Sequence, residues 1–185
     1  MSLTTDLAKL EQWLRQRSPT TWASLRPPAT LDAIDSTAHQ IGVRILPDLK
    51  RLWRWHDGSE GALVAGVPLQ PGHYLLGVNG ALVEWHGRTD VAGYSGDSRS
   101  WSPQWLPITS DGAGNHFVVD HRPGPELGSV FVADLQNGPM RHRGWPSLAD
   151  LVRDLCDALT HGRPVDGHLP HITEEGRLAW TFSPA

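Results

Sequence analysis

Only one cysteine, Cys156, occurs in the 185 residues, so the chain cannot form an internal disulfide. It lies in an apolar helical pattern, which predicts a buried thiol rather than a reactive one. No stretch reaches the roughly 18 consecutive apolar residues that a membrane-spanning helix needs. The first residues, MSLTTDLAKLEQW, lack the basic stretch and apolar run of a signal peptide, and we therefore expect a cytoplasmic protein.

An excess of basic residues is also missing. The 20 acidic residues outnumber the 16 lysines and arginines, which gives a formal net charge of −4. Proteins that bind nucleic acid need a basic surface to neutralise phosphates, so this balance argues against nucleic acid as the main partner. The length suits one domain that buries its own core.

Apolar residues at helical spacing predict three helices in the first third of the chain and one near its end. Each predicted helix begins or ends at a capping or helix-breaking residue. The four segments are residues 5–17, the stretch from Thr30 to Gly42, the stretch from Pro47 to Asp57-Gly58, and the stretch from Pro146-Ser147 to Gly162.

The middle of the chain is rich in short β-type segments. Predicted strands cover residues 63–67, 74–78, 116–120 and 128–134, and the tail around Leu178 and Trp180 allows one more. Residues 105–108 form a further apolar segment. Periodicity leaves residues 81–85 open between helix and strand, and residues 93–103 are predicted to form a loop. Helices in front, strands in the middle and a helix behind predict an α+β fold.

The segment Asp111-Gly-Ala-Gly-Asn-His116 raises the question of a phosphate-binding loop. A Walker loop ends in Gly-Lys-Ser/Thr, and a dinucleotide fingerprint needs a third glycine followed by a helix. Neither pattern is present, because Asn115 follows the second glycine and a predicted strand comes next. Asp, Gly and Asn are the residues that adopt positive φ in tight strand connections, so we predict a hairpin turn at residues 112–114.

Ten histidines are present, and His116 could combine with Asp111 and Asp120 in a metal site. His168 and His171 form a second candidate pair. The chain nevertheless lacks the ligand spacings typical of zinc and calcium sites, and it has no Gly-x-Ser-x-Gly nucleophile motif. We therefore expect no bound metal and no cofactor. The alternative is a small-ligand-binding protein or a metal-dependent hydrolase that uses Asp111, His116 and Asp120.

Nine tryptophans are unusual for this length. Trp53, Trp105 and Trp180 lie in apolar patterns and are predicted to be buried. Trp101 stands in the polar segment S-R-S-W-S-P, where an exposed aromatic residue beside charges is typical of a binding hot spot. An equally weighted alternative is that Trp101 folds back and anchors its own loop.

Several segments together resemble the SUKH superfamily, whose founding members are fungal Smi/Knr cell-wall assembly regulators. The run I41-G-V-R-I-L-P-D-L-K-R-L-W-R-W-H-D-G58 is similar to the family's first signature, in which Leu-Pro opens a helix that Asp-Gly or Asn-Gly closes. The run W105-L-P-I-T-S-D-G-A-G-N-H-F-V-V-D120 is similar to the second. Gly128-Ser-Val and Pro146-Ser-Leu follow in the expected order.

This resemblance implies an α+β domain with a single mixed or mainly antiparallel sheet, flanked by N-terminal helices and one C-terminal helix. It implies one domain over residues 1–185, with residues 1–30 as a variable N-terminal helix and residues 163–185 as a C-terminal extension. Many bacterial members are similar to immunity proteins that neutralise polymorphic toxins by direct binding, and fungal members resemble regulatory scaffolds. The resemblance therefore implies a non-enzymatic module that binds a protein, such as a cognate toxin domain.

Toxins of this kind are often nucleases, whose basic surfaces attract carboxylates. The acidic residues expected to be free of helix-capping roles are Asp57, Glu60, Asp97 and Asp111. We predict that they form an acidic rim around Trp101 that contacts the partner. The rival interpretation is that these acids only keep the protein soluble.

Overall fold

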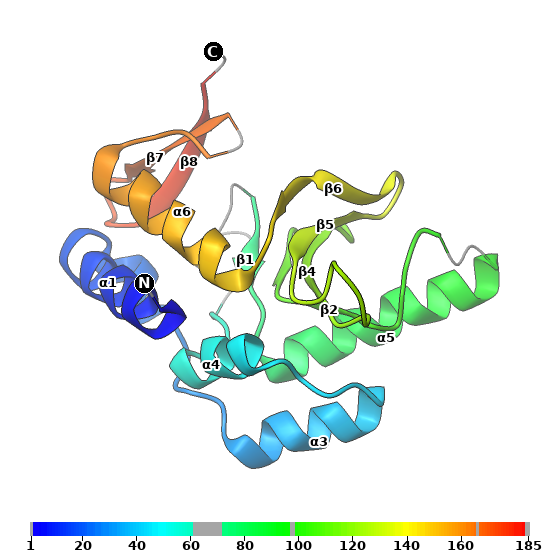
Figure 1. The fold of residues 1–185 in the computed structure, drawn as a ribbon. Coiled ribbons are helices and arrows are strands. Elements are labelled where there is room, and N and C mark those ends of the chain that lie inside the picture. Colours follow the sequence, from blue (N-terminus) through cyan, green and yellow to red (C-terminus); the bar gives the residue numbers. More distant parts are fainter. Residues whose placement is uncertain (1, 61–71, 97–98, 166, 184–185) are drawn as a thin grey trace.

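The computed structural model describes residues 2–60, 72–96, 99–165 and 167–183, and combines helices with antiparallel sheets (Figure 1). The predicted α+β class is confirmed. The chain begins with four helices: α1 (Leu3–Arg17), α2 (Pro19–Ala23), α3 (Leu31–Ile41) and α4 (Pro47–Trp55).

Capping residues explain where these helices start and stop. The Thr30 hydroxyl accepts a hydrogen bond from the Ala33 N–H, and Gly42 ends α3 in the left-handed region with φ of 65°. Pro47 occupies the first turn of α4, where its missing N–H costs nothing. Three predicted helices are thus confirmed. The short helix α2 was not predicted; Pro19 occupies its first turn.

The segment after α4 differs most from expectation. The strand predicted at 74–78 is only two residues long, β1 (Tyr74–Leu75), and the strand predicted at 63–67 lies outside the described residues. The helix α5 (Val78–Ser95) resolves the open choice at residues 81–85 and also takes up the start of the predicted loop at 93–103. Three glycines inside this helix weaken its local signal.

A close backbone crossing fixes where α5 begins. One carboxylate oxygen of Asp57 accepts the Val78 N–H at 2.7 Å and so caps the helix. A Cβ atom on Gly58, whose φ is 77°, would collide with the backbone of Gly77, and one on Gly77 would collide with the carbonyl of Asp57. Only glycine fits at these two positions, and the crossing holds the end of α4 against the start of α5.

The strands pair antiparallel throughout, but they do not form the single sheet that was expected. Four of them make the main sheet in the order β2-β4-β5-β6, while β1 pairs with β3 and β7 pairs with β8 in two separate ribbons. The remaining bounds are β2 (Trp105–Pro107), β3 (Thr109–Ser110), β4 (His116–Asp120), β5 (Val130–Asp134) and β6 (Gly138–Trp145). The strand β6, with the sequence GPMRHRGW, was missed because it contains none of the β-branched residues that mark a strand.

The C-terminal part consists of α6 (Leu148–His161), β7 (His168–Ile172) and β8 (Leu178–Phe182). The predicted final helix and the tail strand are confirmed, whereas β7, which contains a proline, was not predicted. The residues around the start of β8 are hydrogen bonded to the residues around the start of α2. Ser18 Oγ donates to the Gly176 carbonyl at 3.0 Å, and the Leu178 N–H donates to Thr21 Oγ1 at 2.8 Å. We call this contact the terminal clasp.

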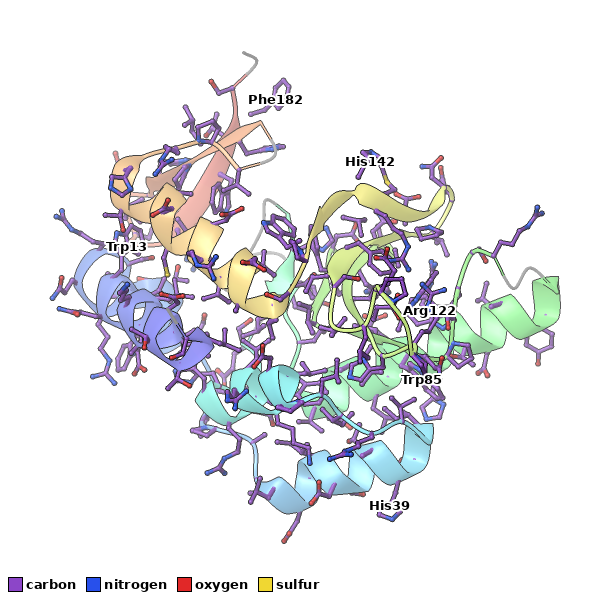
Figure 2. The ribbon with its side chains drawn as sticks, in the orientation of Figure 1. Trp13, His39, Trp85, Arg122, His142 and Phe182 are labelled. Carbon is purple, nitrogen blue, oxygen red and sulfur yellow. The ribbon has the colours of Figure 1, made fainter. Side chains whose placement is uncertain are left out.

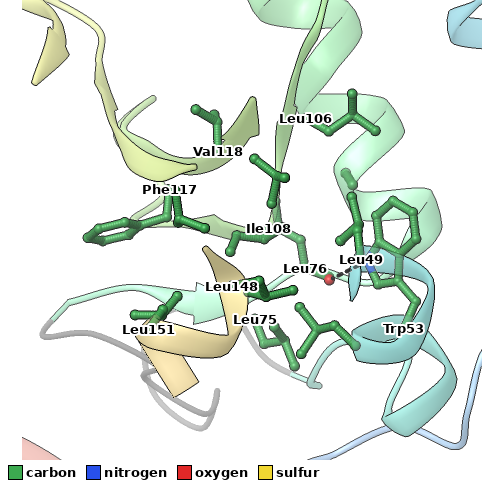
Figure 3. Close-up of a cluster of buried hydrophobic side chains, with 14 of the residues drawn as sticks. Leu49, Trp53, Leu75, Leu76, Leu106, Ile108, Phe117, Val118, Leu148 and Leu151 are labelled. Carbon is green, nitrogen blue, oxygen red and sulfur yellow. Dashed lines mark hydrogen bonds between the residues drawn. The ribbon is translucent and has the colours of Figure 1, made fainter. Parts of the chain in front are cut away.

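The core lies where α4, α6 and the strands meet (Figure 3). Leu49 and Trp53 from α4 are fully buried there together with Ile108, and Leu148 from α6 closes the cluster. The Trp53 indole N–H donates to the Leu76 carbonyl at 3.3 Å, so its one polar atom is satisfied. The predicted burial of Trp53 and Trp105 is confirmed, and Trp180 is half-buried against the same core.

The segment between β3 and β4 is a tight turn, as predicted. The Asp111 N–H donates to the Asn115 carbonyl at 3.2 Å, and Gly112 and Gly114 have φ values of 76° and 95°. A carboxylate oxygen of Asp111 accepts the N–H groups of Ala113 and Asn115, at 2.8 and 3.0 Å. The glycines therefore serve the chain reversal, and the carboxylate of Asp111 is directed into the turn.

We predict that Gly114→Ala lowers the free energy of unfolding by more than about 1 kcal/mol, because a Cβ atom is unfavourable at positive φ. Urea unfolding measures this. Gly87→Ala is the matched control, because Gly87 lies inside α5 with open space around its Cβ position. That variant should gain up to about 1 kcal/mol from the better helix propensity of alanine. A Gly114→Ala protein as stable as the parent would contradict the turn assignment.

Candidate protein-binding surface

The structure contradicts the prediction that Trp101 is exposed. Its side chain is 2% exposed, and its indole N–H donates to Thr89 Oγ1 of α5 at 3.1 Å. The Arg88 guanidinium carbon lies 5.1 Å from the Trp101 ring centre, and the Trp105 ring meets it edge-on at 5.9 Å. Trp101 therefore anchors its loop to α5, which was the alternative interpretation.

Two of the acidic residues predicted to form a rim around Trp101 are engaged within the fold. Asp57 caps α5 and Asp111 is held inside the turn, so the carboxylates of both have structural roles. Burial alone would raise the pKa of Asp111, but hydrogen bonds from Ala113 and Asn115 outweigh it and hold this pKa below its usual value. Glu60 is exposed, and its backbone N–H donates to the Ser24 carbonyl. Asp97 lies outside the described residues.

The alternative site of Asp111, His116 and Asp120 is not assembled either. His116 and Asp120 are at opposite ends of β4, about 13 Å apart at 3.3 Å per residue. His116 is fully buried, and its Nδ1 lies 3.2 Å from the Thr109 carbonyl, which can only accept, so Nδ1 carries the proton. Among the described residues, no group of three or more His, Cys, Asp or Glu side chains is placed to hold a metal ion.

Asp120 is instead the buried partner of two arginines. Arg122 and Arg141 each approach it with a guanidinium nitrogen, at 2.7 and 2.8 Å. Burial alone would raise the pKa of Asp120, but the hydrogen bonds from Arg122 and Arg141 outweigh it and keep the pKa below its usual value. The carboxylate is fully covered, so it cannot act as a general base towards a substrate.

The single thiol is half-buried rather than buried. Burial raises the pKa of Cys156 to about 11, and its Sγ lies 3.4 Å from the Asp6 carbonyl. A thiol that stays protonated at neutral pH is a poor nucleophile.

What the structure does expose is an apolar strip along α5. Val83, Val91 and Tyr94 are 61%, 54% and 94% exposed, and Gly87 lies between them in the sequence. At 100° per residue these four positions fall within an arc of about 80°, and they extend over about 16 Å of the helix. We call them the α5 strip.

Polar residues border the α5 strip on one side, while the opposite face of the helix is buried. Asn79, His86 and Asp90 are exposed, and Ala81 and Trp85 pack into the core. A surface helix normally turns polar residues outward, so a helix that is apolar on both faces indicates a second contact. An apolar centre with an aromatic residue and a polar border is the usual arrangement of a protein-binding surface.

The α5 strip was missed in the sequence because residues 81–95 were not assigned to a helix. Had they been, the spacing of Val83, Gly87, Val91 and Tyr94 would have placed them on one face. The other exposed large apolar side chains lie outside α5; they are Leu31, Leu127, Leu135, Ile172 and Phe182. Figure 2 shows Phe182 near the end of β8, far from α5. None of the helices in the described part of the chain has both the length and the apolar character to cross a lipid bilayer.

Comparison with protein families gives a match over more than half of the chain. Residues 28–154 match the family model described as the SMI1/KNR4 family (SUKH-1). The matched region runs from the loop before α3 into α6 and contains the whole of α5. The comparison with curated proteins finds no match.

We predict that Asp57→Ala lowers the free energy of unfolding by about 1 kcal/mol through loss of the α5 cap. Asp57→Asn keeps an oxygen acceptor for the Val78 N–H and should lose clearly less. Thermal or urea unfolding of the two variants measures the difference. If Asp57→Ala is as stable as the parent, the capping role is contradicted. Asp57 would then again be a candidate for contact with the partner.

The buried histidines should make the fold sensitive to acid. Burial lowers the pKa of both His116 and His121, so the folded protein holds them neutral. The unfolded chain takes up these protons first, and stability should fall as the pH drops below about 6.5, the ordinary histidine value.

His116→Gln should reduce the slope of the unfolding free energy against pH between pH 7 and the acid limb, measured by urea unfolding at each pH. The matched control is His39→Gln, on the exposed side of α3 (Figure 2), which should keep the slope of the parent. A slope that is the same in all three proteins would contradict the assignment of neutral His116.

Proposed function

The chain belongs to the SMI1/KNR4 family (SUKH-1), and from this membership and the α5 strip we propose that it is a non-enzymatic protein-binding module of the immunity type. It would neutralise a toxin in the cytoplasm by direct binding. Membership of this family supports a general role as a Smi/Knr-like or immunity-type protein, and the members of the family are generally non-catalytic.

The observation that carries the proposal is the outward-facing α5 strip. Three apolar side chains on 18 residues of helix, one of them a tyrosine that is 94% exposed, cost free energy while they face water. Tyrosine is one of the residues that supply most of the binding energy in protein interfaces. A protein partner that covers the strip would convert this exposed surface into affinity.

The proposal also changes which residues are expected to contact the partner. The predicted acidic rim with Trp101 at its centre is replaced by Val83, Val91 and Tyr94, with Asn79 and Asp90 at the border. Trp101 does not belong to this face, but its hydrogen bond to Thr89 attaches the loop that follows α5 to the helix. Its replacement would act through the position of the helix rather than by a direct contact.

The test starts from the neighbouring gene. If it encodes a large secreted protein with a toxic C-terminal domain, we expect the chain to bind that domain and to restore growth of cells that express it. Tyr94→Ser and Val91→Ser should each weaken binding at least about tenfold, which corresponds to a contact of 1.4 kcal/mol. Titration calorimetry with the purified toxin domain measures the dissociation constants.

Phe182→Ser is the matched control, since Phe182 is 64% exposed but lies on β8. It should bind the toxin domain like the parent. Neutralisation that survives both α5 substitutions would show that another face is used. A neighbouring toxin that the chain neither binds nor neutralises would contradict the immunity function itself.

A further inference from the structure

A second surface, beside the loop that Trp101 anchors, has a different chemistry. A pocket of about 500 Å³ opens between this loop, the end of β4 and the strand β6. Its walls include the side chains of Arg99, Arg122 and Arg141 and the edges of Trp101 and Trp105. Figure 2 labels Arg122 where the chain leaves β4. We call it the arginine pocket.

Asp120 holds two of these arginines in fixed orientations. Arg122 binds it through Nε at 3.0 Å and through Nη2 at 2.7 Å, and its guanidinium carbon lies 5.1 Å from the Trp105 ring centre. Arg141 binds the same carboxylate through Nη2 at 2.8 Å, and its guanidinium lies 4.0 Å from the Phe131 ring centre. Fixed guanidinium planes lose little entropy when they bind a further acceptor.

Both arginines keep donors for such an acceptor. A guanidinium has five N–H groups, and Asp120 takes only some of them. Nη1 of Arg122 and Nε of Arg141 donate to none of the described residues. The two side chains are 38% and 32% exposed, whereas Asp120 is buried beneath them. The outward part of the pocket therefore offers hydrogen-bond donors, with the nearly buried rings of Trp101 and Trp105 behind them.

We infer that the arginine pocket binds an acidic side chain, aspartate or glutamate, from a peptide segment of the protein partner. Guanidinium groups recognise planar carboxylates with two parallel hydrogen bonds. The apolar residue next to such a carboxylate would lie against Pro103 and Pro139, which line the same pocket. This inference rests on the proposed function in that it takes the partner to be a protein.

Nucleic acid is the competing anion, and two observations disfavour it. A phosphate backbone would extend beyond the pocket over a protein with a net charge of −4. Glu126, which is 52% exposed and 3.0 Å from Arg141, stands at the rim and would repel the next phosphate. A short peptide places only one or two charges in the pocket and avoids this repulsion.

The experiment measures direct binding of short probes to the full chain by fluorescence anisotropy. The acidic probe is a short fluorescein-labelled peptide that contains two glutamates flanked by phenylalanines. The comparison probes are the same peptide with lysine for glutamate and a labelled single-stranded oligodeoxynucleotide of equal charge. We expect the acidic peptide to bind at least tenfold more tightly than either comparison probe.

Arg122→Lys and Arg141→Lys keep the positive charge next to Asp120 but remove the planar fork, so each should weaken binding of the acidic peptide at least tenfold. Arg153→Lys is the matched control, because Arg153 is 42% exposed and pairs with Asp150 on α6, away from the pocket. Thermal unfolding by circular dichroism checks that the variants are folded.

Three outcomes would overturn the inference: no binding of the acidic peptide at millimolar concentration, equal binding after both arginine substitutions, or tighter binding of the oligonucleotide. The test is independent of the α5 strip. Tyr94→Ser should leave the peptide affinity unchanged, so failure of the immunity function and failure of the arginine pocket are distinguished.

Discussion

The backbone crossing of residues 57–58 with residues 76–77 is the constraint on which the rest of the structure depends. Neither Gly58 nor Gly77 has room for a side chain, and the carboxylate of Asp57 closes the crossing by capping α5. The contact joins the end of α4, which carries Trp53 into the core, to the start of α5. Once the two ends are fixed together, α5 has one face against the sheet and the other towards solvent. The core and the exposed strip are thus two results of one local geometry.

The two candidate surfaces share a support. Trp101 is hydrogen bonded to Thr89 on α5 and lies edge-on to Trp105, which forms part of the arginine pocket. Trp85 of α5 donates in turn to the Pro103 carbonyl, so the loop between α5 and β2 is tied to the helix at two points. Trp85, Trp101 and Trp105 therefore hold the loop between α5 and β2 in place beside the arginine pocket.

Local signals were sufficient for the parts of the fold that local chemistry determines. Thr30, Gly42 and Pro47 mark their helices because capping is a short-range effect, and the Asp-Gly-x-Gly-Asn turn was recognised for the same reason. The same signals failed for α5, because the glycines at 80, 87 and 93 lower its helix propensity. The helix is stabilised instead by tertiary contacts, such as the hydrogen bonds of Trp85 and Arg88 to distant segments. The prediction of the partner-binding residues failed for a related reason. Exposure of Trp101 and freedom of Asp57 depend on contacts with residues 12 to 21 positions away, which no motif records.

The terminal clasp has a consequence for the order of folding. It joins residues 18–21 to residues 176–178, a separation of more than 150 positions. Closing so long a loop costs conformational entropy, and contacts that have already formed must offset this cost. Contacts of such long range form late, after the local helices and hairpins. During synthesis the N-terminal residues emerge from the ribosome long before their β8 partners exist. Until then the hydroxyls of Ser18 and Thr21 are left to hydrogen bond with water.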